Sequence, residues 1–213
     1  MSARVGCDAT GGAGNKKTVS LIGANQSFAG WVWLALGIAV FCLVASRHSR
    51  AADLELRGMG VRTQIGEKTR VLGEEQPESF YEYDIVASFQ MPWERQIWSG
   101  WGARARLQTH AGVLRGSNNT GLVVSAIPAL AFGKQGGQFK IEMGVGLAWL
   151  SRHRFDRQDF GGPLQFALTF GAGAPLSRRV EAGYRFMHYS DAGVYGTGHI
   201  GADSHMVELI QCF

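Results

Sequence analysis

Apolar and polar residues alternate with a period of two along most of the chain from about residue 52 onward. In residues 141–149 the odd positions carry large apolar side chains, whereas the even positions carry Glu142, glycine and alanine. The same alternation recurs in residues 79–90, 98–111, 164–171 and 179–190. Because successive side chains of a β-strand point to opposite faces of the sheet, this pattern predicts strands with one apolar and one polar face.

Eight such segments follow one another between residues 52 and 213, with short links such as MPWERQ and APLSR alternating with longer ones. The segments are 54–65, 79–90, 98–113, 121–133, 139–151, 163–171, 179–190 and 203–213. An even number of strands, each able to supply the roughly 9–11 residues that a tilted membrane strand needs, is typical of outer-membrane proteins. The predicted fold class is therefore all-β, as an eight-stranded antiparallel transmembrane β-barrel.

A secreted β-sandwich would also alternate, with its apolar residues inside. Three features favour the inverse arrangement, with the apolar face outside. The polar face carries full charges beside glycines, which suits the lumen of a small barrel. Aromatic residues such as Trp98 and Trp149 cluster near strand ends, as interface girdles do, and the last strand ends in Phe213. Segment 121–133 departs from the pattern, because it is apolar on both faces and contains Pro128, which cannot donate a ladder hydrogen bond.

The front of the chain has the features of an export signal. Residues 31–45, WVWLALGIAVFCLVA, carry no charge, follow Lys16 and Lys17, and precede the small residues around Ala51 and Ala52. The uncharged stretch is short for a membrane-spanning helix. We therefore expect residues 1–51 to be a signal peptide and residues 52–213 to form the barrel. The stretch before the apolar segment is long for a signal peptide. The alternatives are therefore that translation starts further along the chain, or that the segment is retained as a membrane anchor.

Charge and cysteine content exclude some functions. Residues 1–51 hold five of the 21 Lys and Arg residues and one of the 17 Asp and Glu residues, which leaves 16 of each sign in the remainder. The basic isoelectric point thus belongs to the front segment, and no nucleic-acid partner is expected. Of the three cysteines only Cys212 lies beyond residue 51, so neither an internal disulfide nor a cysteine metal site is expected in the barrel.

The stretch RFMHYSDAG brings a histidine and a serine to the end of one predicted strand. Along 179–190 the odd positions belong to the polar lumen face, so His188 and Ser190 project outward. Asp203 opens the last predicted strand, also points outward, and is brought close to them by one connecting loop. Such a trio performs acyl transfer, because the histidine takes the serine proton while the carboxylate orients the imidazole. Polar residues that merely end a membrane strand are the alternative interpretation.

Two stretches, GYRFMHYSDAG and IGADSHMVEL, closely resemble the end of the lipid A 3-O-deacylase (PagL) family. That family's pattern runs roughly as HYSNAG, a loop with an Asn-Pro-Gly or Asn-Asp-Gly turn, and Glu or Asp opening the last strand. The stretch FKIEMGVGLAWLS is similar to another strand of the family. The resemblance covers essentially all of 52–213, and its specific part is 184–206. It implies a serine esterase that hydrolyses the 3-O-linked acyl chain of lipid A, with His188 as general base, Ser190 as nucleophile and Asp203 as orienting acid.

Two positions depart from the family pattern. Asp191 replaces the asparagine after the serine, and His199 replaces the asparagine that opens the loop turn. An anion at Asp191 would repel the developing oxyanion, which amide donors stabilise. Compensation can come from the backbone N–H groups of Ala192 and Gly193, from a His199 N–H, or from Asp191 turning toward a cation or solvent.

The resemblance also implies location and partners. It implies export to the outer membrane of a Gram-negative cell, lipid A or lipopolysaccharide as substrate, surrounding outer-membrane lipids, and no cofactor or metal. Whether the chain forms a homodimer is left open by the resemblance. The alternative function is a non-catalytic small outer-membrane barrel, structural or adhesive, or an inactive relative. The outward trio favours the enzyme, because polar groups on a lipid-facing surface are costly without a role.

Two further groups of polar residues have structural interpretations. His110 lies on the predicted lumen face near Arg104 and Arg106, where a hydrogen-bond network with carboxylates is expected rather than a metal site. The expected carboxylates are Glu82, Asp84 and Glu142. The run RHRFDRQD, residues 152–159, is expected to be a solvated outer loop, and contact of its cations with lipid A phosphates is the alternative.

Overall fold

A computed structural model describes residues 54–66, 76–134, 139–196 and 198–213. The expected signal peptide, residues 1–51, lies outside the described residues. Among the residues that are described, no helix has the length and apolar character needed to cross a membrane.

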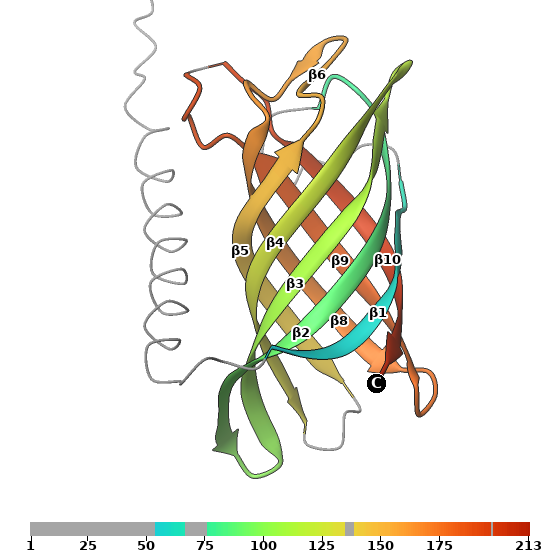
Figure 1. Ribbon diagram of the computed structural model, residues 1–213, viewed down its shortest axis with the longest axis vertical. Helices are drawn as coiled ribbons and strands as arrows, with labels where there is room; N and C mark the ends of the chain where they lie inside the picture. The colour runs from blue at the N-terminus through green and yellow to red at the C-terminus, as the bar shows by residue number, and fades with distance from the viewer. Residues whose placement is uncertain (1–53, 67–75, 135–138, 197) are drawn as a thin grey trace, which may run out of the picture. The chain divides into compact units, whose positions relative to one another are not determined.

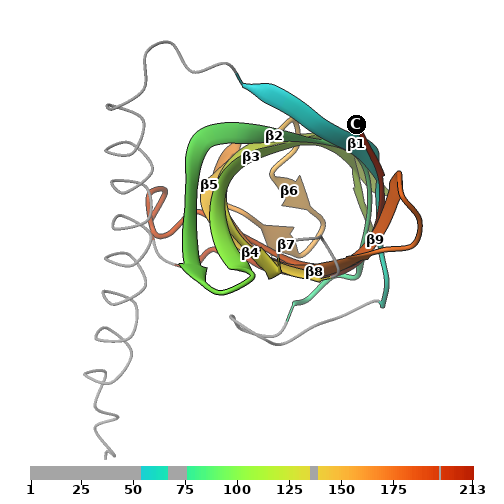
Figure 2. The same cartoon turned by 90° about the horizontal axis from the view of Figure 1, so that it is seen from below.

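Eight antiparallel strands close into a ring (Figures 1 and 2). They are β1 (Glu55–Gln64), β2 (Phe80–Trp98), β3 (Trp101–Gly116), β4 (Asn119–Lys134), β5 (Lys140–Leu150), β8 (Leu164–Pro175), β9 (Val180–Ser190) and β10 (Ala202–Cys212). Each strand pairs with the next one of the ring, and the first pairs with the last to close it. The all-β, eight-stranded antiparallel ring predicted from the sequence is confirmed.

The link between the second and third predicted strands was placed wrongly. MPWERQ is not a connection, because β2 continues through it to Trp98 and the turn consists of Ser99 and Gly100, with φ of 77° at the glycine. The extension is supported by a cross-strand ion pair, in which Arg104 Nε donates to Glu94 Oε1 over 2.7 Å. The ladder is irregular between Gln90 and Glu94, where Pro92 has no N–H to donate.

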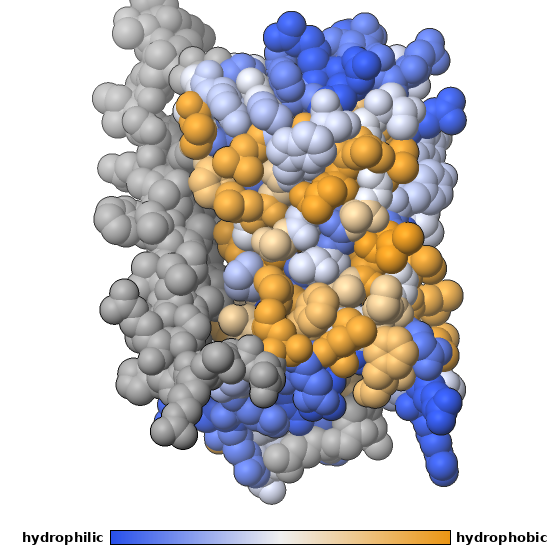
Figure 3. Space-filling model, in the orientation of Figure 1, coloured by the Kyte–Doolittle hydropathy of each residue, from blue (hydrophilic) through white to orange (hydrophobic). Residues whose placement is uncertain are grey.

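The two faces of the strands differ as the alternation predicts. On β2, Tyr83 and Ile85 are 56% and 63% exposed, whereas Glu82 and Asp84 are buried in the lumen. Figure 3 shows apolar side chains over the middle of the visible barrel face and hydrophilic residues above and below them. The barrel therefore has an apolar outer face and encloses buried charged residues, unlike a soluble sandwich.

A charged network crosses the lumen. Arg185 of β9 donates to Glu142 of β5 over 2.8 Å and to Glu208 of β10 over 2.7 and 3.0 Å. All three side chains are at most 3% exposed. Arg106 of β3 lies 3.2 Å from Glu142, and Arg62 of β1 lies 3.4 Å from Glu208. These contacts bind five strands across the ring.

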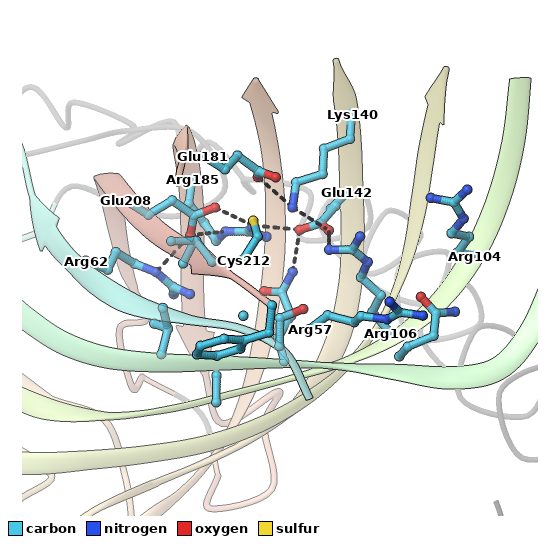
Figure 4. A pocket seen from close by; sticks show the side chains of 18 of the residues that line it. Arg57, Arg62, Arg104, Arg106, Lys140, Glu142, Glu181, Arg185, Glu208 and Cys212 are labelled. Atoms are coloured by element: carbon cyan, nitrogen blue, oxygen red, sulfur yellow. Dashed lines mark hydrogen bonds and ion pairs between the residues drawn. The ribbon is translucent and has the colours of Figure 1, made fainter. Parts of the chain in front are cut away.

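The network borders a cavity of about 380 Å³ beside the C-terminal residues Cys212 and Phe213 (Figure 4). Lys140 lies there between two carboxylates, 2.6 Å from Glu181 and 3.3 Å from Glu142. Because nearly every charge of this group has an opposite charge within reach, the lumen at this end is a structural polar core.

A small hairpin lies within the outline of the ring when the barrel is seen along its length (Figure 2). Its strands are β6 (Arg154–Phe155) and β7 (Gln158–Asp159). The side chains of Phe155 and Phe160 are buried and pack against Phe80, with ring centroids 5.3 and 5.8 Å away. The expectation that 152–159 is simply a solvated loop is wrong for Phe155 and Gln158, which are buried, whereas Arg154 and Arg157 are exposed as expected. Phe155, together with Phe160 after the hairpin, closes the apolar core at the end of the barrel opposite the C-terminus (Figure 1).

Candidate active site

The registers of β9 and β10 place a histidine opposite a carboxylate on the outer face. Asp203 is the cross-strand partner of His188, and the His188 Nδ1 to Asp203 Oδ1 distance is 2.5 Å. The neighbouring side chains Met187 and Tyr189 are fully buried on the opposite, lumen face. The outward direction predicted for His188 and Asp203 thus agrees with the strand geometry. The two side chains are 17% and 6% exposed.

Ser190 lies two residues beyond His188, on the same face and at the end of β9. Continuing the register by one step sets it opposite Gly201. A Cβ atom built on Gly201 would lie 3.1 Å from His188 Cε1 and 3.3 Å from Ser190 Cβ. The imidazole edge and the serine therefore border the same short piece of main chain. No hydrogen bond joins Ser190 to His188 among the described residues, and such bonds often tighten only when substrate binds.

The loop after Ser190 is organised by Asp191. Its Oδ1 accepts the N–H of Gly193 over 3.0 Å, and its Oδ2 accepts the N–H of Tyr195 over 3.4 Å. His199 Nδ1 lies 3.1 Å from the same Oδ2. The structure thus has Asp191 turned toward backbone N–H groups and His199. The Gly193 N–H, which the sequence suggested as a donor to the oxyanion, is engaged by this carboxylate instead.

The loop rests on the β6–β7 hairpin. Gln158 Nε2 donates to the carbonyl oxygens of Ile200 and Gly201 over 2.5 and 3.0 Å. The Ile200 N–H donates to the Asp159 carbonyl over 3.2 Å. Burial alone would raise the pKa of the Asp159 side chain, but the Gly161 N–H and the Arg154 guanidinium hold it below its usual value. Gln158 was not predicted as a site residue, because nothing in its local sequence distinguishes it from a solvated loop glutamine.

The outer cations of this hairpin are paired within the protein. Arg154 donates to Asp159 over 2.6 Å, and Arg157 donates to Glu78 over 3.0 Å. The two arginine side chains are 70% and 71% exposed. They remain accessible to an external anion, although each already has a carboxylate partner.

A second group of histidine, serine and acid lies in the lumen. His110 Nδ1 is 2.6 Å from Ser125 Oγ, and His110 Nε2 is 3.1 Å from the Tyr189 hydroxyl, which donates to Glu82 over 2.6 Å. All four side chains are buried. Ligand atoms of Glu82, Asp84 and His110 lie within 4.8 Å of one another. Because both His110 nitrogens are engaged and Arg62 lies 3.9 Å from Asp84, we interpret this group as a structural network.

A family model described as lipid A 3-O-deacylase (PagL) matches residues 81–210, a range that includes β2 through most of β10. A crystal structure of the outer membrane enzyme PagL has the same fold, with a TM-score of 0.59. The two sequences are 20% identical, and the match covers 72% of this chain and 97% of that chain. No curated protein sequence matches the chain.

Proposed function

Because this chain belongs to the lipid A 3-O-deacylase family, we propose that it is a serine esterase that hydrolyses the 3-O-linked acyl chain of lipid A. The observation that carries this proposal is the outward His188–Asp203 pair with Ser190 beside it. An ester of a membrane lipid would reach these residues from the lipid phase, on the face where the barrel is apolar.

In the proposed reaction Ser190 Oγ attacks the ester carbonyl carbon while His188 Nε2 accepts its proton. Asp203 holds His188 Nδ1 and stabilises the imidazolium. The tetrahedral intermediate expels the sugar hydroxyl, which takes the proton from His188. Water then attacks the acyl-serine by the same route in reverse and releases the fatty acid.

We assign Asp191, Gly193 and His199 a supporting role in this proposal. They form one hydrogen-bonded loop next to the nucleophile. Because the Asp191 carboxylate receives backbone N–H groups on both oxygens, its charge is partly offset before any oxyanion develops nearby.

The proposed location is the outer membrane, reached by export with removal of residues 1–51. The apolar outer face and the charged lumen support a membrane-spanning barrel formed by residues 52–213. After expression in a Gram-negative host, the mature chain should fractionate with the outer membrane and migrate differently on gels before and after boiling. Recovery from the soluble periplasmic fraction would contradict the transmembrane assignment.

The activity is tested by mass spectrometry of lipid A from the same host. Expression of the wild-type chain should remove the mass of one 3-hydroxyacyl group, and fragmentation should locate the loss at the 3-position. If the barrel is present in the outer membrane but lipid A is unchanged, the chain is a non-catalytic member of the family, which is the alternative function.

A further inference from the structure

The Gly201 main chain forms one wall of the proposed active site. It lies opposite Ser190 and just before β10, beyond the last paired residues Ala202 and Tyr189. The space where a Cβ of residue 201 would sit is bounded by His188 Cε1, Ser190 Cβ and the Tyr189 carbonyl oxygen, the last at 2.6 Å. The position of this piece of main chain therefore sets how closely the base and the nucleophile can approach.

The strand ladder does not hold this wall. The last paired residues are Tyr189, one residue before Ser190, and Ala202, one residue after Gly201. The wall is held from the side by Gln158 of β7, whose amide nitrogen lies 2.5 Å from the Ile200 carbonyl oxygen and 3.0 Å from that of Gly201. The Gln158 residue is 0% exposed. One side-chain amide thus binds both carbonyl groups of the segment that the catalytic pair contacts.

We propose that Gln158 is a positioning residue of the active site, which fixes the Ile200–Gly201 main chain against His188 and Ser190. This proposal rests on the function proposed above. Without the amide, two partly buried carbonyl groups lose this donor and the segment relaxes toward other partners. A displacement of roughly 1 Å at a reacting pair costs about 100-fold in rate. Gln158 acts through main chain and does not touch the substrate.

The side chain of Gln165 provides a matched control. It is also 0% exposed, and its Nε2 donates to two carbonyl oxygens, those of Phe160 at 3.0 Å and Gly162 at 2.7 Å. Those carbonyls belong to the segment that follows the β6–β7 hairpin, and neither is part of the Ile200–Gly201 main chain that borders His188 and Ser190. Loss of either amide should therefore destabilise the same end of the barrel, but only loss of the Gln158 amide should disturb the catalytic pair.

The test compares Gln158→Met with Gln165→Met in purified, refolded barrel. Gln158→Met should lower kcat by about 10- to 100-fold with KM within about twofold, whereas Gln165→Met should keep kcat within about threefold. Melting temperatures should fall to a similar extent in both. Wild-type kcat in Gln158→Met, or equal kcat losses in the two variants, would overturn the proposal.

Gln158→Glu adds a readout that a merely structural role would not produce. A carboxylate repels the two carbonyl oxygens, whereas the protonated acid restores one donor. The ratio of variant to wild-type kcat should therefore rise as the pH is lowered, while the same ratio for Gln158→Met stays flat. A flat ratio for the glutamate variant would count against positioning by hydrogen bonds.

A measurement that needs no turnover separates this proposal from the proposed function. The imidazole ¹⁵N signals of His188, assigned with a His188→Asn variant, should shift in Gln158→Met and remain unchanged in Gln165→Met. A wild-type chain that fails to deacylate lipid A would refute the proposed function, while the His188 signals would still decide whether Gln158 positions this pair. Unchanged signals in Gln158→Met would overturn the inference.

Discussion

The barrel contains two groups of serine, histidine and acid, one in the lumen and one on the outer face. In the lumen, His110 is bound by Ser125 at 2.6 Å and by Tyr189 at 3.1 Å, and Tyr189 donates to Glu82. On the outer face, His188 has one hydrogen-bond partner among the described residues, which is Asp203 at 2.5 Å. By hydrogen bonding alone, the lumen group is the more complete of the two.

The difference shows that composition and hydrogen bonding do not distinguish a catalytic group from a structural one. The lumen histidine and its serine are 3% and 4% exposed, so a lipid ester cannot reach either residue. On the outer face, Nδ1 is held by the carboxylate while Nε2 has no partner among the described residues, and this is the face that we propose meets the lipid phase. Access and an available base nitrogen favour the outer group as the site of chemistry.

Replacing each of the two serines by alanine should show most clearly which group performs the chemistry. Ser190→Ala should reduce deacylation by about 10⁴-fold or more, because within the described part of the chain no other nucleophile lies beside His188. Ser125→Ala, the matched control, should leave turnover per folded molecule within about twofold and lower only the melting temperature. The measurement is lipid A mass spectrometry with purified barrel. Full activity in Ser190→Ala would place the chemistry elsewhere.

The two acids should differ in the same sense. Asp203→Ala removes the group that orients the imidazole, and it should retain roughly 100-fold more activity than Ser190→Ala, because an orienting carboxylate contributes less than the nucleophile. Glu82→Gln, which keeps an acceptor for the Tyr189 hydroxyl, should leave turnover unchanged. Initial rates of both variants check this, and a larger loss in the Glu82 variant would reverse the two roles.

The lumen network should determine stability rather than rate. Glu142→Leu leaves Arg106, Lys140 and one arm of Arg185 without their shared carboxylate, which should cost about 3–5 kcal/mol of unfolding free energy. Arg106→Leu should have a smaller effect, because its side chain is 17% exposed at the cavity. Denaturant unfolding in micelles measures both. Loss of turnover at unchanged stability would show that these residues belong to the site.

The smallest effect is expected at Asp191. Asp191→Asn keeps an oxygen for the Gly193 N–H and removes the negative charge beside the nucleophile, so kcat should stay the same or rise by up to about threefold. Steady-state kinetics at neutral pH check this. A tenfold or larger decrease would mean that the charge pairing with His199 is needed to hold the loop.

Sequence alone predicts those parts of the molecule that depend on local periodicity. Alternation gave the eight strands and their faces, and it set His188, Ser190 and Asp203 on one side because spacing along a single hairpin fixes their direction. It did not predict that Arg185 meets Glu142 across the ring, because such contacts depend on strand tilt and closure. The hydrogen bonds from Gln158 to the two carbonyl groups could not be predicted for the same reason, because they join segments that are far apart in the sequence.

All three proposed catalytic residues are carried by the β9–β10 hairpin, where His188 and Asp203 are 15 positions apart, whereas Tyr189 and Glu82 of the lumen group are 107 positions apart. The proposed chemistry is thus local in the sequence, whereas the lumen contacts join strands from the whole chain, including β9 and β10 through Arg185 and Glu208. Point changes in one hairpin can silence or retune the chemistry while the barrel is kept intact. A relative whose barrel has the same strand tilt could acquire the reaction by receiving this hairpin together with the hairpin segment that carries Gln158.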